Sequence, residues 1–144
     1  MAHETLLKFR YPDTLIREYR CWAVLLRPDQ VTASNLVLVC TLDVGRFSDV
    51  PLDAFSELGK VVGDIENTIA RLLHYDKINY LMLMMVDKQV HFHVLPRYSG
   101  PRIFGGVNFI DGSWPAPPNL SQVTATTPAE FQTMLEELRA DWPA

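Results

Sequence analysis

Gln89-Val-His-Phe-His-Val-Leu-Pro-Arg-Tyr98 is the stretch around which the chain is organised. Apolar residues at 90, 92 and 94 alternate with Gln89, His91 and His93. Because successive side chains of a β-strand point to opposite faces, this alternation predicts three nitrogen-bearing side chains on one face. They would cover roughly 13 Å at about 3.3 Å per residue, a length that suits a linear substrate such as a polyphosphate.

The segments on either side of this strand predict an antiparallel sheet. We expect strands at 14–18, 21–27 and 36–40, and the last, Leu-Val-Leu-Val-Cys, is continuously apolar and therefore covered on both faces. Residues 78–86 predict another strand. Only Asp87-Lys88 separates it from the histidine strand, so we expect these two to form an antiparallel hairpin that turns at Asp87-Lys88, with a loop that could be one residue wider at each side.

Helical periodicity appears twice. From Pro51 to about His74 apolar residues recur at spacings of three and four, which predicts a long helix that packs on the sheet. The Gly- and Pro-rich segment 99–118 is expected to lack regular structure. A capping box, Thr127-Pro-Ala-Glu130, then predicts a short C-terminal helix.

Together these elements predict an α+β fold, with an antiparallel sheet of about five strands, one long helix and a short C-terminal helix. The length of 144 residues suits one domain, 1–144, with its core in 14–98 and a C-terminal loop and helix in 99–144.

Composition excludes several classes of function. Thirteen basic and seventeen acidic residues give a net charge of −4, which argues against non-specific nucleic-acid or anionic-membrane binding, although a local basic pocket can still hold a phosphate. The N-terminus lacks the apolar stretch of a signal peptide, and no apolar run approaches a membrane span of about 18 residues. We expect a cytoplasmic protein. Cys21 and Cys40 lack metal-ligand spacing and are interpreted as buried thiols.

The two histidines of the strand allow three interpretations. They could simply be half-exposed residues of a sheet face. They could bind a metal, since His-x-His on a strand presents two imidazoles to one ion, but a third ligand is lacking. Here His3 lies in a terminus expected to be flexible, His74 ends a helix and Asp87 lies in a turn.

The third interpretation is nucleophilic catalysis. One imidazole attacks a phosphorus atom to form a phosphoramidate, and the imidazole two residues away donates to the leaving group. Here Gln89-Val-His-Phe-His-Val-Leu-Pro-Arg97 resembles the histidine triad motif, His-φ-His-φ-His-φ-φ, with the Pro-Arg ending found in dinucleoside polyphosphate hydrolases of that superfamily. The order of strands, long helix and hairpin agrees with it, and the resemblance covers about residues 14–98.

The resemblance implies roles for individual residues. The middle triad position, the nucleophile of the family, falls on His91, and the last, which faces the leaving group, falls on His93. Gln89 replaces the first histidine, and Asn35 stands where the family has a histidine before the Leu-Val-Leu-Val strand; neither side chain titrates. Both would bind the substrate by orienting its phosphates, or would orient the imidazoles. Arg97 could hold a phosphate, or could instead be solvated or salt-bridged.

The implied function is a nucleotide hydrolase that attacks the α-phosphate of a dinucleoside polyphosphate or a nucleoside phosphoramidate through a covalent nucleotidyl-histidine. No cofactor is required, although a divalent cation could accompany the substrate, and the resemblance implies a homodimer. The family also has a longer Gly- and Gln-containing loop before the triad than Asp87-Lys88 provides. The alternatives are a catalytically degenerate nucleotide-binding protein of the same fold and, less favoured, a metal-dependent hydrolase.

Overall fold

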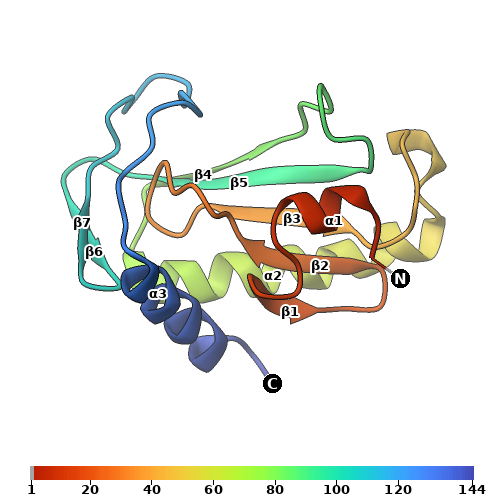
Figure 1. Ribbon diagram of the computed structural model, residues 1–144, viewed down its shortest axis with the longest axis horizontal. Coiled ribbons are helices and arrows are strands. Elements are labelled where there is room, and N and C mark those ends of the chain that lie inside the picture. Colours follow the sequence, from red (N-terminus) through yellow and green to blue (C-terminus); the bar gives the residue numbers. More distant parts are fainter. Residues whose placement is uncertain (1) are drawn as a thin grey trace.

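A single antiparallel sheet organises the protein. The structure, a computed structural model, describes residues 2–144. The sheet has the strand order β1-β2-β3-β5-β4 (Figure 1). Its strands are β1 Leu15–Glu18, β2 Trp22–Leu26, β3 Leu36–Cys40, β4 Lys77–Leu81 and β5 His91–Arg97. With a long helix and a C-terminal helix packed on this sheet, the predicted α+β class is confirmed.

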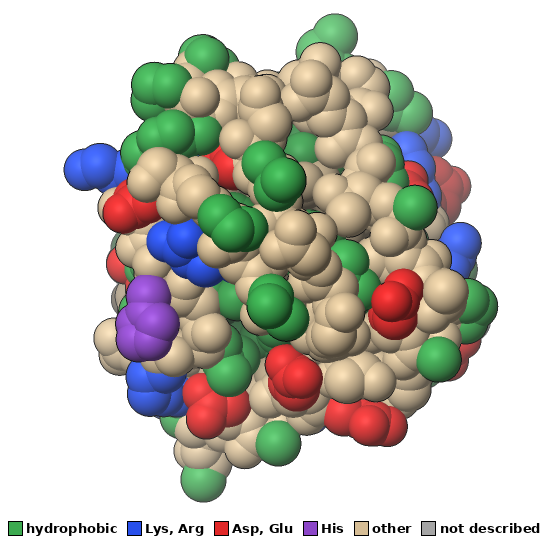
Figure 2. Space-filling model, turned by 90° about the vertical axis from the view of Figure 1, so that its left-hand side faces the viewer, with side chains coloured by type: hydrophobic (Ala, Val, Ile, Leu, Met, Phe, Trp, Pro, Cys, Tyr) green, Lys and Arg blue, Asp and Glu red, His purple; other side chains and the backbone are tan. Residues whose placement is uncertain are grey.

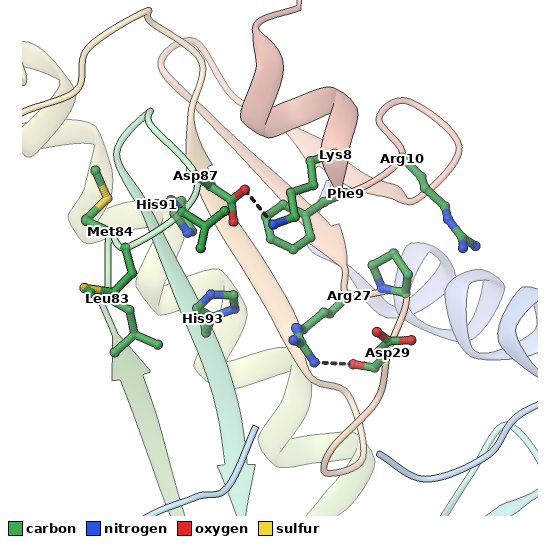
Figure 3. Close-up of a pocket in the computed structure, with 13 residues that line it drawn as sticks. Lys8, Phe9, Arg10, Arg27, Asp29, Leu83, Met84, Asp87, His91 and His93 are labelled. Carbon is green, nitrogen blue, oxygen red and sulfur yellow. Dashed lines mark hydrogen bonds and ion pairs between the residues drawn. The ribbon is translucent and has the colours of Figure 1, made fainter. Parts of the chain in front are cut away.

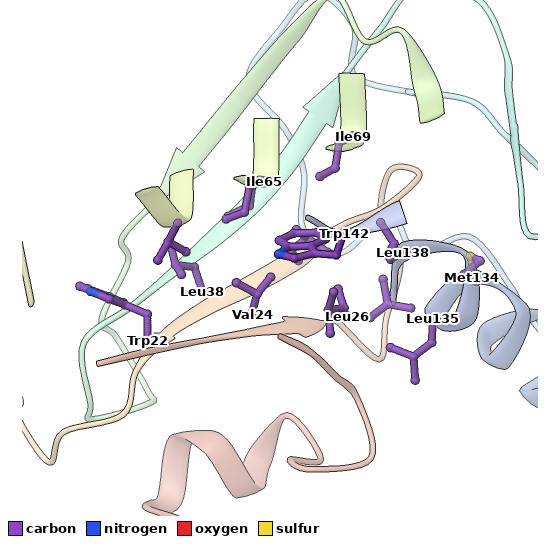
Figure 4. Close-up of a cluster of buried hydrophobic side chains, with 14 of the residues drawn as sticks. Trp22, Val24, Leu26, Leu38, Ile65, Ile69, Met134, Leu135, Leu138 and Trp142 are labelled. Carbon is purple, nitrogen blue, oxygen red and sulfur yellow. The ribbon is translucent and has the colours of Figure 1, made fainter. Parts of the chain in front are cut away.

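Helices cover both faces of the sheet, and every residue of β2 and β3 is buried. The helices α2, Leu52–Leu73, and α3, Pro128–Asp141, pack on one face, where they enclose the larger core cluster (Figure 4). A one-turn 3-10 helix, Phe47–Asp49, precedes α2. Because successive strand residues face opposite ways, the continuously apolar strand is covered on both sides, as predicted.

The opposite face of the sheet is covered by a short N-terminal helix, α1, Glu4–Lys8. Leu6 and Phe9 pack there in a second cluster with side chains from the two central strands. The His3 ring accepts from the Leu6 N–H, and its Nε2 lies 2.7 Å from the carbonyl oxygen of Cys40. The expectation of a flexible N-terminus is therefore wrong, because α1 has both a cap and a buried apolar side.

The predicted hairpin turn at Asp87-Lys88 is also wrong. Strand β4 ends at Leu81, which pairs with His93, and residues 82–90 form a loop that rises from the sheet (Figure 1). Leu83, Met85 and Val86 are apolar but largely exposed. No layer of the protein covers their side chains, so the apolar composition of this run does not reflect a buried strand.

The segment expected to be irregular contains a second small sheet. Strands β6, Arg102–Phe104, and β7, Val107–Phe109, pair around Gly105-Gly106, whose φ angles are +59° and +78°. Such positive φ angles suit a tight hairpin turn. Phe104 and Phe109 are buried in the larger cluster, so the hairpin extends the core beyond the five-stranded sheet.

This end of the molecule is shown in Figure 2. In this view hydrophobic side chains are scattered among polar ones. Ile103 and Ile110 are among the exposed apolar residues near the hairpin of β6 and β7. The hydrophobic side chains form no continuous apolar patch on this face.

The two long helices match their predicted limits closely. Helix α2 ends with His74 in the left-handed conformation, and the capping box of α3 is present, with Thr127 and Glu130 bonding each other's backbone N–H. Among the helices of residues 2–144, none combines the length and apolar character that a membrane crossing requires.

Candidate functional site

His91 and His93 share a cavity on the α1 side of the sheet. They pair across the sheet with Val39 and Val37, two residues of the cluster under α1. The cavity has a volume of about 430 Å³, within the usual range of small-molecule sites. We call it the histidine cavity; it is lined by residues 8–10, 27–29, 83–87, His91 and His93 (Figure 3).

A backbone carbonyl orients His91. Its Nδ1 lies 2.8 Å from the carbonyl oxygen of Gln89, and the ring is 2% exposed. A carbonyl oxygen can only accept, so Nδ1 carries the proton and Nε2 keeps a free lone pair. This hydrogen bond therefore selects the tautomer in which Nε2, the nitrogen that can attack, carries the lone pair.

His93 stands beside His91, and Phe9 contacts both rings. The two imidazole centroids are 5.3 Å apart at 81°, and Phe9 lies 6.0 Å from one and 5.9 Å from the other. Burial, with the nearby His91 and Arg27, lowers the pKa of His93 to about 4. His93 is therefore neutral at pH 7. Its Nδ1 is buried without a protein partner, which leaves Nε2 as the nitrogen that can reach a ligand.

Basic side chains line the cavity: Lys8 and Arg27 face the two imidazoles, whereas Arg10 lies at its outer edge with its guanidinium pointing away from them (Figure 3). Lys8 and Arg10 reach the cavity from the end of α1, and Arg27 from the segment that follows β2 (Figure 3). Lys8 Nζ forms an ion pair with Asp87 at 2.7 Å, which joins α1 to the 82–90 loop across the cavity. Sequence reasoning missed these three residues because they come from two separate segments, neither of which carries a recognisable motif.

Gln89 and Asn35 do not line the histidine cavity. The Gln89 amide bonds Thr5 and Asp43: its Oε1 accepts from the Thr5 hydroxyl at 2.6 Å, and its Nε2 donates to Asp43 at 2.9 Å. Asn35 is fully buried, and its amide accepts from the Val31 N–H and donates to the carbonyl of a β5 residue. The structure therefore corrects the prediction that these two amides bind substrate directly. Both amides instead hold the backbone around β5 in place.

Arg97 also lies away from the cavity, although it belongs to the same strand. It is 4% exposed and forms a two-bond ion pair with Asp111, at 2.7 and 3.2 Å. It also donates to Asn79 and to the carbonyl of Ala116. This placement corrects the prediction that Arg97 binds a phosphate, because its guanidinium is already occupied.

The described part of the chain, residues 2–144, contains no group of three or more His, Cys, Asp or Glu side chains placed to hold a metal ion. Of the residues predicted for the site, the structure thus brings His91 and His93 together in one cavity. Gln89 contributes through its backbone carbonyl.

Comparison with known proteins identifies the fold. A histidine triad protein from Bradyrhizobium japonicum is 21% identical, with a TM-score of 0.76 over 99% of this chain and 97% of that one. Another from Marinobacter aquaeolei is 22% identical, with a TM-score of 0.76 over 99% and 95%. A hypothetical histidine triad nucleotide-binding protein from Sulfolobus tokodaii is 15% identical, with a TM-score of 0.69 over 95% and 88%.

No protein-family model and no curated protein matches the sequence. The structural likeness shows that the chain has the fold of histidine triad proteins, which confirms the resemblance in fold.

Proposed function

We propose that this chain, which has the histidine triad fold, is a nucleotide hydrolase whose nucleophile is His91. The observation that supports this most is the hydrogen bond from His91 Nδ1 to the Gln89 carbonyl, which leaves the Nε2 lone pair free beside a basic cavity. The Sulfolobus neighbour is described as nucleotide-binding, and nucleotides carry the anionic phosphates that such a cavity attracts.

In the proposed reaction Nε2 of His91 attacks the α-phosphorus. An N–P bond forms while the bond from phosphorus to the leaving group breaks: a polyphosphate leaves as its anion, and the nitrogen of a phosphoramidate, protonated in the substrate, leaves as ammonia. The imidazole gains positive charge, which the Gln89 carbonyl stabilises through its hydrogen bond from Nδ1. Water then attacks phosphorus, the N–P bond breaks, and a nucleoside monophosphate leaves with the imidazole restored.

His93 serves the leaving group in this proposal. Since burial keeps its imidazole neutral, it donates a hydrogen bond from Nε2–H rather than a proton from an imidazolium. The ring contact with Phe9 holds it next to His91. The substrates proposed are a dinucleoside polyphosphate or a nucleoside phosphoramidate.

The remaining features stay predictions. The resemblance implies a homodimer; the cytoplasmic location and catalysis without a resident cofactor, with a divalent cation that could accompany the substrate, are predictions from the sequence and from the imidazole chemistry. Because the imidazole itself supplies the nucleophile, hydrolysis of the phosphoramidate should persist in a chelator such as EDTA. A metal-dependent hydrolase would lose activity on the same treatment.

The experiment compares native protein with His91→Ala on diadenosine tetraphosphate and on adenosine 5′-phosphoramidate, with products separated by chromatography. Native protein should release AMP from at least one substrate, and His91→Ala should lose this by a factor on the order of 10³ or more. His74→Asn serves as control, since His74 is exposed at the far end of α2.

A native protein that binds AMP but releases no product from either substrate would contradict the hydrolase. It would favour a nucleotide-binding protein, in which the replacements at Gln89 and Asn35 have removed turnover. Release that survives in His91→Ala would instead place the nucleophile elsewhere.

A further inference from the structure

Arg27 lines the histidine cavity, and its guanidinium is incompletely hydrogen-bonded. Its Nη1 donates to the backbone carbonyl of Asp29 at 2.8 Å, while its Nε is buried and has no partner among residues 2–144. No carboxylate of the described chain forms an ion pair with it. A half-buried guanidinium that lacks both an anion and one of its hydrogen bonds is costly unless a ligand supplies them.

Arg27 lies on the same face of the sheet as the histidine pair, but at a distance from it. Arg27 follows Leu25 by two residues, and Leu25 belongs to the cluster under α1, so the Arg27 side chain leaves the sheet on the histidine side. Strand β3 lies between β2 and β5, so the two strands are about 10 Å apart. Figure 3 shows Arg27 on one side of His93 and Leu83 and Met84 on the other.

The other charged side chains around the cavity do not neutralise the positive charge of Arg27. Lys8 is paired with Asp87, whereas exposed Arg10 also reaches the cavity and has no ion pair within residues 2–144. Burial lowers the pKa of Arg27, and the nearby Asp29 carboxylate, which forms no ion pair with it, opposes this effect. The Arg27 side of the cavity therefore has unpaired positive charge separate from the two imidazoles.

We infer that Arg27 binds a second anionic group of the ligand, so that the preferred ligand is a nucleotide with two phosphates rather than one. The inference rests on the proposed function for the first phosphate, which lies at His91. The planar guanidinium fork suits bidentate binding of a phosphate. The second phosphate belongs either to the phosphate chain or to the sugar, since the same chemistry recognises both.

Calorimetric titration of the native protein tests this with three ligands: AMP, adenosine 5′-(α,β-methylene)diphosphate and adenosine 3′,5′-bisphosphate. We expect at least one of the last two to bind roughly tenfold or more tightly than AMP, the gain typical of a charged hydrogen bond. Preference for the methylene diphosphate places the second group on the phosphate chain. Preference for the 3′,5′-bisphosphate places it on the sugar.

Three variants make the test specific. Arg27→Gln should reduce the advantage over AMP to within about twofold while AMP itself still binds, and Arg27→Lys should keep part of it because the charge remains. Arg20→Gln is the matched control, since Arg20 is exposed and paired with Asp53 away from the cavity. Thermal unfolding should show each variant folded.

The inference is overturned if neither bisphosphorylated ligand binds native protein more tightly than AMP, or if the advantage survives in Arg27→Gln. Absence of binding by all three ligands would overturn it together with the proposed function. If the Arg27-dependent advantage is found but neither diadenosine tetraphosphate nor adenosine 5′-phosphoramidate is hydrolysed, only the hydrolase is contradicted.

Discussion

At the scale of single residues, the backbone decides what the histidines can do. His91 receives its orientation from the carbonyl of Gln89, a residue whose side chain points into a different network. A glutamine in the first triad position removes a titrating group but leaves this carbonyl in place. The replacement is therefore compatible with nucleophilic attack by His91.

The carbonyl of Gln89 depends in turn on Thr5, whose hydroxyl donates to the Gln89 side chain and accepts from its N–H at 3.1 Å. Thr5→Val leaves the buried Gln89 N–H unpaired and removes one of the two hydrogen bonds from Thr5 to the Gln89 Oε1, so we expect a loss of about 1–3 kcal/mol in the free energy of unfolding. Turnover should fall on the order of tenfold, because the His91 ring loses its alignment. Chemical denaturation and steady-state kinetics measure the two effects.

Thr133→Val is the matched control, since the Thr133 hydroxyl is exposed and bonds only its own helix. It should change stability by no more than about 0.5 kcal/mol. Native turnover in a folded Thr5→Val protein would argue against the orienting role of this network.

His93 makes stability depend on pH. Its pKa is about 4 in the folded protein and about 6.5 when unfolded, so between these values the unfolded chain binds more protons. Stability should therefore rise with pH across this window, and should fall by about 2–3 kcal/mol from this residue between pH 7 and pH 4.5. Urea unfolding of native protein and His93→Gln at both pH values isolates the contribution.

The difference in stability between the two pH values should be smaller in His93→Gln by that amount. His74→Asn, at an exposed position, should behave as native protein does. An identical pH dependence in native and His93→Gln proteins would show that His93 is not held in its neutral form by the fold.

At the scale of elements, the patterns of apolar residues predicted the buried helices and strands correctly. They were misleading where the apolar residues are exposed. The Leu36–Cys40 strand, α2 and α3 follow from their apolar spacing, because each packs an apolar side on the core. The 82–90 loop is rich in apolar residues too, yet Leu83, Met85 and Val86 are exposed. Composition alone does not distinguish a buried apolar strand from an apolar loop at the mouth of a cavity.

The hairpin of β6 and β7 was not predicted, because its two glycines were interpreted only as residues that interrupt regular secondary structure. Gly105 and Gly106 both have positive φ, but a Cβ at Gly105 would lie 2.2 Å from Met134 Cγ, whereas one at Gly106 meets nothing within 4 Å. Gly106→Ala should cost about 1–2 kcal/mol from its backbone alone. Gly105→Ala should cost a further 1–3 kcal/mol, roughly, from overpacking against α3.

Denaturant unfolding of the two variants measures this difference. Turnover at the histidine cavity should remain native in both, since the hairpin contributes nothing to its lining. Equal costs for the two substitutions would contradict the packing of β6 and β7 against α3.

At the scale of the whole molecule, the site is assembled from three separate parts of the chain. Strand β5 provides the imidazoles, α1 covers them with Phe9 and Lys8, and the end of β2 brings Arg27. The histidines could be predicted because they share one strand and one periodicity. Lys8 and Arg27 could not, because only the packing of α1 and the course of the sheet bring them to the same cavity.

The proposed reaction requires that His91 becomes covalently attached to the nucleotide. The most direct measurement is intact-protein mass spectrometry of native protein mixed with adenosine 5′-phosphoramidate and quenched in alkaline denaturant, where a phosphoramidate linkage survives. We predict a fraction of the protein heavier by one adenylyl group, with peptide mapping to His91, and no such species in His91→Ala. Hydrolysis by native protein with no adduct at any quench time, or an adduct on another residue, would contradict the account.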